Sequence, residues 1–142
     1  MKIMSVDMGD ARTGIAICDK AEMLASPVTV IHEWNKDVLA QKVVAEAKKL
    51  DAEQIVVGNP LNMNGTAGPR SELCHEFADK LRAMCDIEVV MWDERNTTVT
   101  AIGYLNVTDT RGKKRKNVVD AVAATIILET YMNYRKNKKE VN

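Results

Sequence analysis

The sequence has few of the residues that mark several large protein classes. It contains three cysteines, six aromatic residues and no apolar run close to the roughly 18 residues of a membrane-spanning helix. The cysteines are odd in number and lack Cys-x-x-Cys spacing, which argues against a disulfide framework and a structural zinc site. We therefore expect Cys18, Cys74 and Cys85 to be reduced thiols. The first residues follow a strand pattern instead of a signal sequence, so we expect a cytoplasmic protein with no membrane partner.

Nucleotide-binding motifs and aromatic clusters are also missing. Neither a Gly-x-x-x-x-Gly-Lys-[Ser/Thr] loop nor a Gly-x-Gly-x-x-Gly pattern occurs, so nothing indicates a phosphate loop or a dinucleotide fold. Trp34 and Trp92 are too few and too far apart to form a stacking platform. If the protein binds nucleic acid, we expect recognition of shape and backbone instead of sequence-specific reading of single strands.

The pattern of apolar residues predicts a single α/β domain that spans residues 1–142, with 46% hydrophobic and 28% charged residues. Strand patterns cover 2–8, 13–19, about 24–31, 55–58 and 87–92, and helical spacing covers 37–50, 71–84, about 97–105 and about 118–134. Short turns join the first three strands, which permits an antiparallel meander, whereas the last two are short, buried and alternate with helices. We therefore expect a central mixed five-stranded sheet flanked by helices.

The net charge of zero hides a strong asymmetry along the chain. Residues 1–110 carry 11 Lys and Arg against 17 Asp and Glu, whereas residues 111–142 carry 9 against 3. The basic residues fall in two runs, 111–116 and 135–139, which suits a polyanionic partner. We expect the first run to be a loop that holds nucleic acid and the second to belong to a basic tail of about 135–142. A solvated loop and a tail that complements a helix C-terminus are the alternatives.

Asp7 lies at the end of the first apolar strand, directly before a tight connection that contains Gly9 and Gly14. An unpaired carboxylate buried in such a strand is costly, so it is expected to be paired, protonated or bound to a metal ion. The alternative is an aspartate that caps the turn.

Further acids occur at two other points of the chain. Asp93 and Glu94 follow the last strand, and Asp120 precedes Ala124 and Ile127 by one and two helical turns. Three carboxylates from these places could meet at one edge of the sheet, where a divalent cation would balance their charge. Two such ions can activate water and stabilise the leaving oxygen in phosphodiester hydrolysis. Asp120 could instead complement the helix dipole.

Four ordered segments resemble the YqgF/RuvX family, and the resemblance covers nearly the whole chain. They are Asp7-x-Gly9-x-x-Arg12-x-Gly14, Gly58-x-Pro60-Leu61-x-Met63-x-Gly65-Thr66, Asp93-Glu94-Arg95-x-Thr97-Thr98 and Lys116-x-x-x-Asp120-x-x-Ala123-Ala124-x-x-Ile127-Leu128. The resemblance implies a ribonuclease-H-like fold, related to RuvC-type Holliday junction resolvases, and a hydrolase that matures the 5′ end of pre-16S rRNA. Asn59 departs from the apolar residue expected between Gly58 and Pro60.

The resemblance also assigns roles to individual residues. Asp7, Glu94 and Asp120 would bind Mg²⁺ or Mn²⁺, with Asp93 as the alternative to Glu94, because neighbouring strand residues point to opposite faces. The expected nucleic-acid contacts are Arg12, Arg95, Lys113, Lys114, Arg115, Lys116, Asn62, Asn64 and Thr66. For the three loop residues, a merely ordered turn is the alternative.

Three readings of the function follow. The first is a metal-dependent endonuclease that acts on structured nucleic acid, either pre-rRNA or branched DNA as in a Holliday junction resolvase. The second is an RNA-binding or ribosome-binding module with a vestigial site. The third is an actin-like or sugar-kinase ATPase, in which an Asp-x-Gly hairpin faces the nucleotide phosphates, but such enzymes normally use two domains.

Overall fold

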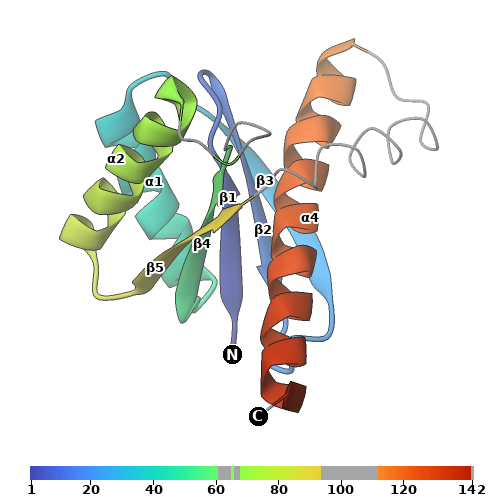
Figure 1. Cartoon of the computed structure of the whole chain (residues 1–142). Coiled ribbons are helices and arrows are strands. Elements are labelled where there is room, and N and C mark those ends of the chain that lie inside the picture. Colours follow the sequence, from blue (N-terminus) through green and yellow to red (C-terminus); the bar gives the residue numbers. More distant parts are fainter. Residues whose placement is uncertain (61–64, 66–67, 94–111, 142) are drawn as a thin grey trace.

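The computed structural model describes residues 1–60, 65, 68–93 and 112–141, and within the last of these ranges the side chains of 122–138. The strands are β1 (Ile3–Asp7), β2 (Arg12–Cys18), β3 (Ala25–His32), β4 (Gln54–Asn59) and β5 (Glu88–Asp93). The helices are α1 (Lys36–Lys49), α2 (Pro69–Met84) and α4 (Gly112–Val141). These elements form three layers, with α1 and α2 on one face of the sheet and α4 on the other (Figure 1). The helix expected at about 97–105 lies outside the described residues.

The five strands form one mixed sheet in the order β3-β2-β1-β4-β5. β1 is central, and it pairs antiparallel with β2 and parallel with β4. β5 continues the parallel half, and β3 pairs antiparallel with β2. The carboxyl ends of β1, β3, β4 and β5 therefore meet the start of β2 at one edge, which we call the site edge. This arrangement confirms the mixed five-stranded sheet expected from the sequence.

The core is divided into two clusters by the alternation of side chains along each strand. Met4, Val6 and Val57 belong to the cluster that packs against α1 and α2. Ile3 and Val56 belong to the other cluster, where residues of α4 cover the sheet. Because successive residues face opposite sides, each acid at the site edge can be assigned to one face from its position in its strand.

The last helix is longer than the sequence pattern indicates. It runs from Gly112 to Val141, whereas the expected range is 118–134. Residues 113–116 are therefore helical and do not form a loop, and residues 135–141 continue the helix instead of forming a tail. The physical reason is that Lys and Arg are good helix formers, and no proline or glycine follows Gly112 to end the helix.

Polar contacts attach α4 to the sheet along its length. The Ser5 hydroxyl donates to the Ala124 carbonyl at 2.6 Å in a buried contact. About two turns further on, the Tyr131 hydroxyl donates to the Gln54 side chain at 2.9 Å. The helix therefore runs antiparallel to β1, because Gln54 pairs with Ile3 at the start of that strand.

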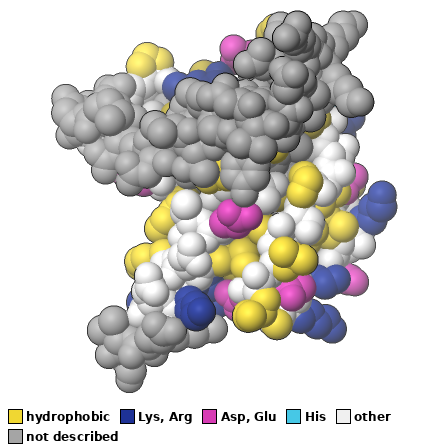
Figure 2. All heavy atoms as spheres, turned by 90° about the vertical axis from the view of Figure 1, so that its right-hand side faces the viewer, with side chains coloured by type: hydrophobic (Ala, Val, Ile, Leu, Met, Phe, Trp, Pro, Cys, Tyr) yellow, Lys and Arg dark blue, Asp and Glu magenta, His cyan; other side chains and the backbone are white. Residues whose placement is uncertain are grey.

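The C-terminal part of α4 is also tied to the β2–β3 connection by charge. The Arg135 guanidinium lies 2.7 Å from the Glu22 carboxylate, which also accepts a bond from the N-terminal ammonium at 3.0 Å. These contacts hold the pKa of Glu22 down at about 2. Figure 2 views this side and shows basic and acidic side chains next to each other near the lower end of the molecule. Arg135 is thus a structural residue and not part of a solvated tail.

The departure at Asn59 also has a structural explanation. Its side-chain oxygen accepts a 2.6 Å hydrogen bond from the Ser71 hydroxyl, and both residues are buried. An apolar residue at position 59 would leave that hydroxyl without this acceptor, so the bond fixes the end of β4 to the first turn of α2.

Glu22→Gln removes the negative charge from the ion pair and should lower the free energy of unfolding by about 1 to 3 kcal/mol at pH 7. The folded pKa of Glu22, about 2, is below its ordinary value of 4.5, so its contribution is complete above pH 4.5 and is lost as the pH falls towards 2. Urea unfolding at several pH values should show the two proteins converging in acid. Glu76→Gln, on an exposed part of α2, is the matched control and should change stability by less than about 0.5 kcal/mol. An unchanged difference at low pH would contradict this assignment.

Candidate metal and nucleic-acid site

Asp7 ends the central strand on the face that α4 covers. Ser5, two residues earlier in β1, donates its hydroxyl bond to α4, and side chains two apart along a strand share a face. Asp7 is partly buried and pairs in register with Gly14 of β2. The expected position of Asp7 at the end of a central strand is therefore confirmed, and its side chain belongs to the layer between the sheet and α4.

Position 120 of α4 lies level with Asp7 along the sheet. Ala124 is fully buried and its carbonyl contacts Ser5, so residue 120 is four residues nearer the helix N-terminus. Four residues of helix rise about 6 Å, and two residues of strand rise about 6.6 Å. Since the helix runs antiparallel to β1, both steps lead towards the site edge. Asp120 thus occupies the turn of α4 that is level with the end of β1.

Asp93 belongs to the opposite face of the sheet. It pairs in register with Asn59, whose side chain bonds to Ser71 of α2. Val89 and Met91, four and two residues earlier, pack into the cluster formed with α1 and α2. Register and alternation therefore separate Asp93 from the face that carries Asp7.

The β1–β2 hairpin places the backbone very close to itself at Gly9. A Cβ atom built there would lie 2.1 Å from the Arg12 carbonyl oxygen, so any other residue would force the backbone to move. The Gly9 amide donates to the Thr13 hydroxyl at 3.4 Å. The glycine predicted to permit a tight connection is thus required by close approach.

Two cations from other elements hold the hairpin carbonyls. The Lys36 ammonium, at the start of α1, donates to the Gly9 and Asp10 carbonyls at 2.9 and 2.8 Å. The Arg70 guanidinium, at the start of α2, donates to the Met8 carbonyl at 2.8 Å and to the Asp10 carboxylate at 2.6 Å. This bond lowers the pKa of Asp10, whereas burial lowers the pKa of Lys36. Sequence reasoning missed both cations, because no local pattern reveals a partner 26 to 62 residues away.

Of the other predicted site residues, some are fully described by the structure, some only in their backbone, and some not at all. Arg12 starts β2 at the site edge, where it pairs in register with His32. Positions 113–116 are in the first turns of α4, but their side chains lie outside the description. Residues wholly outside the described part are Glu94, Arg95, Asn62, Asn64 and Thr66. Among the side chains that are described, no three acids, histidines or cysteines lie together as metal ligands.

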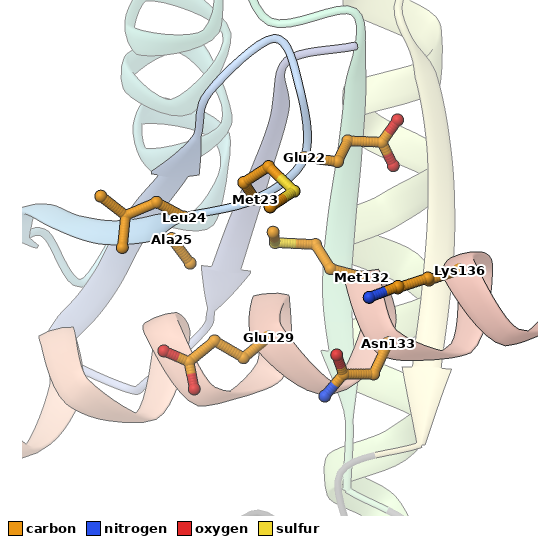
Figure 3. A pocket seen from close by; sticks show the side chains of 8 residues that line it. All are labelled: Glu22, Met23, Leu24, Ala25, Glu129, Met132, Asn133 and Lys136. Carbon is orange, nitrogen blue, oxygen red and sulfur yellow. The ribbon is translucent and has the colours of Figure 1, made fainter.

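A pocket at the opposite end of the molecule is separate from these residues. Met23 and Leu24 of the β2–β3 connection line it, together with Glu129, Met132 and Lys136 of α4 (Figure 3). It lies beside the start of β3, whereas Asp7 lies at the end where β3 finishes.

Within the described part of the chain, no helix has both the length and the hydropathy needed to cross a membrane.

Residues 1–134 match the family described as "RuvX: Holliday junction resolvase". The chain belongs to the YqgF/RuvX family. A relative from Halothermothrix orenii named "Putative pre-16S rRNA nuclease" is 43% identical over 135 residues, which cover 95% of this chain and 96% of the relative. One from Caldanaerobacter subterraneus with the same name is 43% identical over 141 residues, with coverage of 96% and 99%. These names agree with the nuclease class of hydrolase expected from the sequence.

Solved structures show the same fold at low sequence identity. RuvC from Thermus thermophilus superposes with a TM-score of 0.58 at 11% identity, over 96% of this chain and 97% of that one. The Holliday junction resolvase of fowlpox virus gives a TM-score of 0.57 at 17% identity, over 94% and 99%. The ribonuclease-H-like fold implied by the resemblance is thereby confirmed.

Lys36→Met should loosen the hairpin without unfolding the sheet, because it removes two hydrogen bonds to carbonyls of the connection. Amide hydrogen exchange of residues 9–11 should accelerate about tenfold, as expected for a loss of about 1.4 kcal/mol. Lys48→Met, on an exposed part of the same helix, is the matched control and should leave exchange at the hairpin unchanged. Equal exchange rates in the two variants would show that Lys36 does not hold the connection.

Proposed function

We propose that this protein is a divalent-metal-dependent endonuclease that cleaves structured RNA, with the 5′ end of pre-16S rRNA as substrate. The observation that carries the proposal is the placement of Asp120 in the turn of α4 that is level with Asp7. Two acids from opposite ends of the chain thereby come to one edge of the sheet. The names of the relatives point to the same substrate.

The proposed metal ligands are Asp7, Glu94 and Asp120. Asp93 belongs to the face covered by α1 and α2, so Glu94 is the member of the pair that we assign to the ion. Three carboxylates suit a hard cation such as Mg²⁺ or Mn²⁺, which prefers oxygen ligands and keeps part of its coordination for water and phosphate. When bound, such ions supply Lewis acidity for the in-line displacement of a phosphodiester oxygen.

The chain's own residues would bind and orient the substrate. Arg12 starts β2 at the same edge as Asp7, and we assign it to the phosphate next to the scissile bond, with Arg95 as a second contact. The basic turns of α4, at 113–116, would hold the backbone further along. Asn62, Asn64 and Thr66 are assigned to ribose or phosphate, and the ribosome is the assembly on which such an enzyme would act.

Branched DNA is the second candidate substrate. The fold is shared with resolvases whose titles name Holliday junctions, including RuvC in complex with its junction substrate at a TM-score of 0.58.

The organisation of residues 1–142 as a single domain and the cytoplasmic location of the protein stay predictions.

Cleavage assays can test the proposal with a 5′ pre-16S rRNA fragment and a four-way DNA junction, each in Mg²⁺ and in Mn²⁺. Asp7→Asn, Glu94→Gln and Asp120→Asn should each reduce the rate by about 100-fold or more, because each removes a ligand charge. Asp93→Asn is the matched comparison and should reduce it by less than about 10-fold. Cleavage of the RNA but not of the junction is the expected result.

Equal cleavage by the wild type and Asp7→Asn would overturn the proposal. Salt-sensitive RNA binding that survives Asp7→Asn, without any metal-dependent cleavage, would instead support a binding module with a vestigial site.

A further inference from the structure

Trp34 is displayed to solvent at the site edge. It is 74% exposed and follows the end of β3, directly before the Asn35 cap of α1. Asp7, Gly14 and Val30 form one row across β1, β2 and β3. Val30 is two strand spacings from Asp7 across the sheet, and Trp34 is four residues further along the chain than Val30. Together these two displacements place the Cα atoms of Asp7 and Trp34 roughly 16 Å apart or less. The indole is therefore within reach of a nucleic acid whose backbone passes Asp7.

The segment that carries Trp34 is held in place on both sides. The Glu33 amide donates to the Ala11 carbonyl of the hairpin at 2.9 Å, and the Glu33 carboxylate accepts from the Asn35 amide at 3.2 Å. Asn35 in turn accepts bonds from the amides of Asp37 and Val38 at 2.9 and 3.1 Å. An exposed aromatic ring on a fixed backbone loses little conformational entropy when a ligand stacks on it.

The charges around Trp34 do not oppose an anionic strand. Among the described residues of the hairpin, the β3–α1 connection and the first turn of α1, Asp10, Glu33 and Asp37 are each paired with a cation, at 2.6 Å to Arg70, 2.9 Å to Lys42 and 2.7 Å to Lys80. Lys36 adds a fourth cation that bonds two neutral carbonyls. Each of these three ion pairs is neutral overall and Lys36 adds one positive charge, so these described groups together are weakly positive, which a phosphate backbone tolerates.

We propose that Trp34 stacks on an unpaired nucleobase of the bound nucleic acid, so that the protein binds a single-stranded segment through a base as well as through the backbone. The proposal rests on the nucleic-acid substrate of the proposed function, and it adds a contact to the base. Every base has a π-face, so a single indole provides affinity for unpaired nucleotides without reading their sequence. This modifies the sequence-based expectation of backbone recognition alone, because one exposed tryptophan needs no platform.

The test is binding without divalent metal, so that it does not depend on cleavage. The probes are a 12-nucleotide single-stranded RNA, the same sequence as DNA and a blunt 12-base-pair duplex, followed by tryptophan fluorescence and anisotropy. Trp34→Ala should weaken binding of the single strand by about 5- to 100-fold, as expected for one stacked base. Trp34→Phe keeps a ring and should stay within about 5-fold of the wild type. Duplex binding should be unchanged, and the RNA and DNA arms show which backbone carries the unpaired base.

Fluorescence gives an independent reading of stacking. Trp92 packs against Tyr131 and Tyr134 with ring centroids 5.4 and 5.1 Å away, so quenching by the single strand should come from Trp34 and disappear in Trp34→Phe. Met84→Ala, a partly exposed apolar residue at the far end of α2, is the matched control and should bind as the wild type does.

Unchanged single-strand binding by Trp34→Ala would overturn the proposal, and so would equal quenching by the duplex. A change only in self-association of Trp34→Ala would also overturn it and would assign the indole to a protein contact. None of these outcomes bears on the proposed nuclease activity, which the cleavage assays of the wild type and Asp7→Asn test separately.

Discussion

The site edge depends on the hydrogen bonding of one hairpin. The connection between β1 and β2 turns too tightly to satisfy all its carbonyls within the sheet, and Lys36 and Arg70 supply donors from two helices. The Ala11 carbonyl receives a third donor from the Glu33 amide. Through these bonds the connection fixes the starts of α1 and α2 relative to β1. The hairpin that follows Asp7 is consequently held by donors from three other segments.

Most of the fold can be predicted from the spacing of apolar residues over short stretches of the sequence. Strand periodicity predicts β1 to β5 within a few residues, and helical spacing predicts α1 and α2, because apolar side chains must face a shared core. The extra turns of α4 are different. Charged residues at 113–116 carry no apolar period, so periodicity could not show that the helix begins before residue 118, although Lys and Arg are good helix formers.

The long-range polar contacts could not be predicted in the same way. Asn59 reads as a departure from the family pattern until Ser71 is seen to donate to it. Arg135 reads as part of a basic tail until Glu22, 113 residues earlier, is seen beside it. The face of the sheet to which Asp93 belongs likewise follows from strand register, because the sequence alone does not show which face of the sheet each strand residue occupies.

The Ser5–Ala124 bond has a mechanical consequence for α4. Residue 120 lies one turn beyond this contact, so a 5° tilt of the helix about Ala124 would displace it by only about 0.5 Å over a lever arm of about 6 Å. If the helix were held instead at Tyr131, whose hydroxyl donates to Gln54 of β4, the lever arm to residue 120 would be about 16 Å. The same tilt would then move residue 120 by about 1.4 Å, beyond the roughly 0.5 Å within which reacting groups must be held. A single buried hydroxyl, which takes no part in the proposed chemistry, thus limits how far an acid 115 positions later in the chain can be displaced.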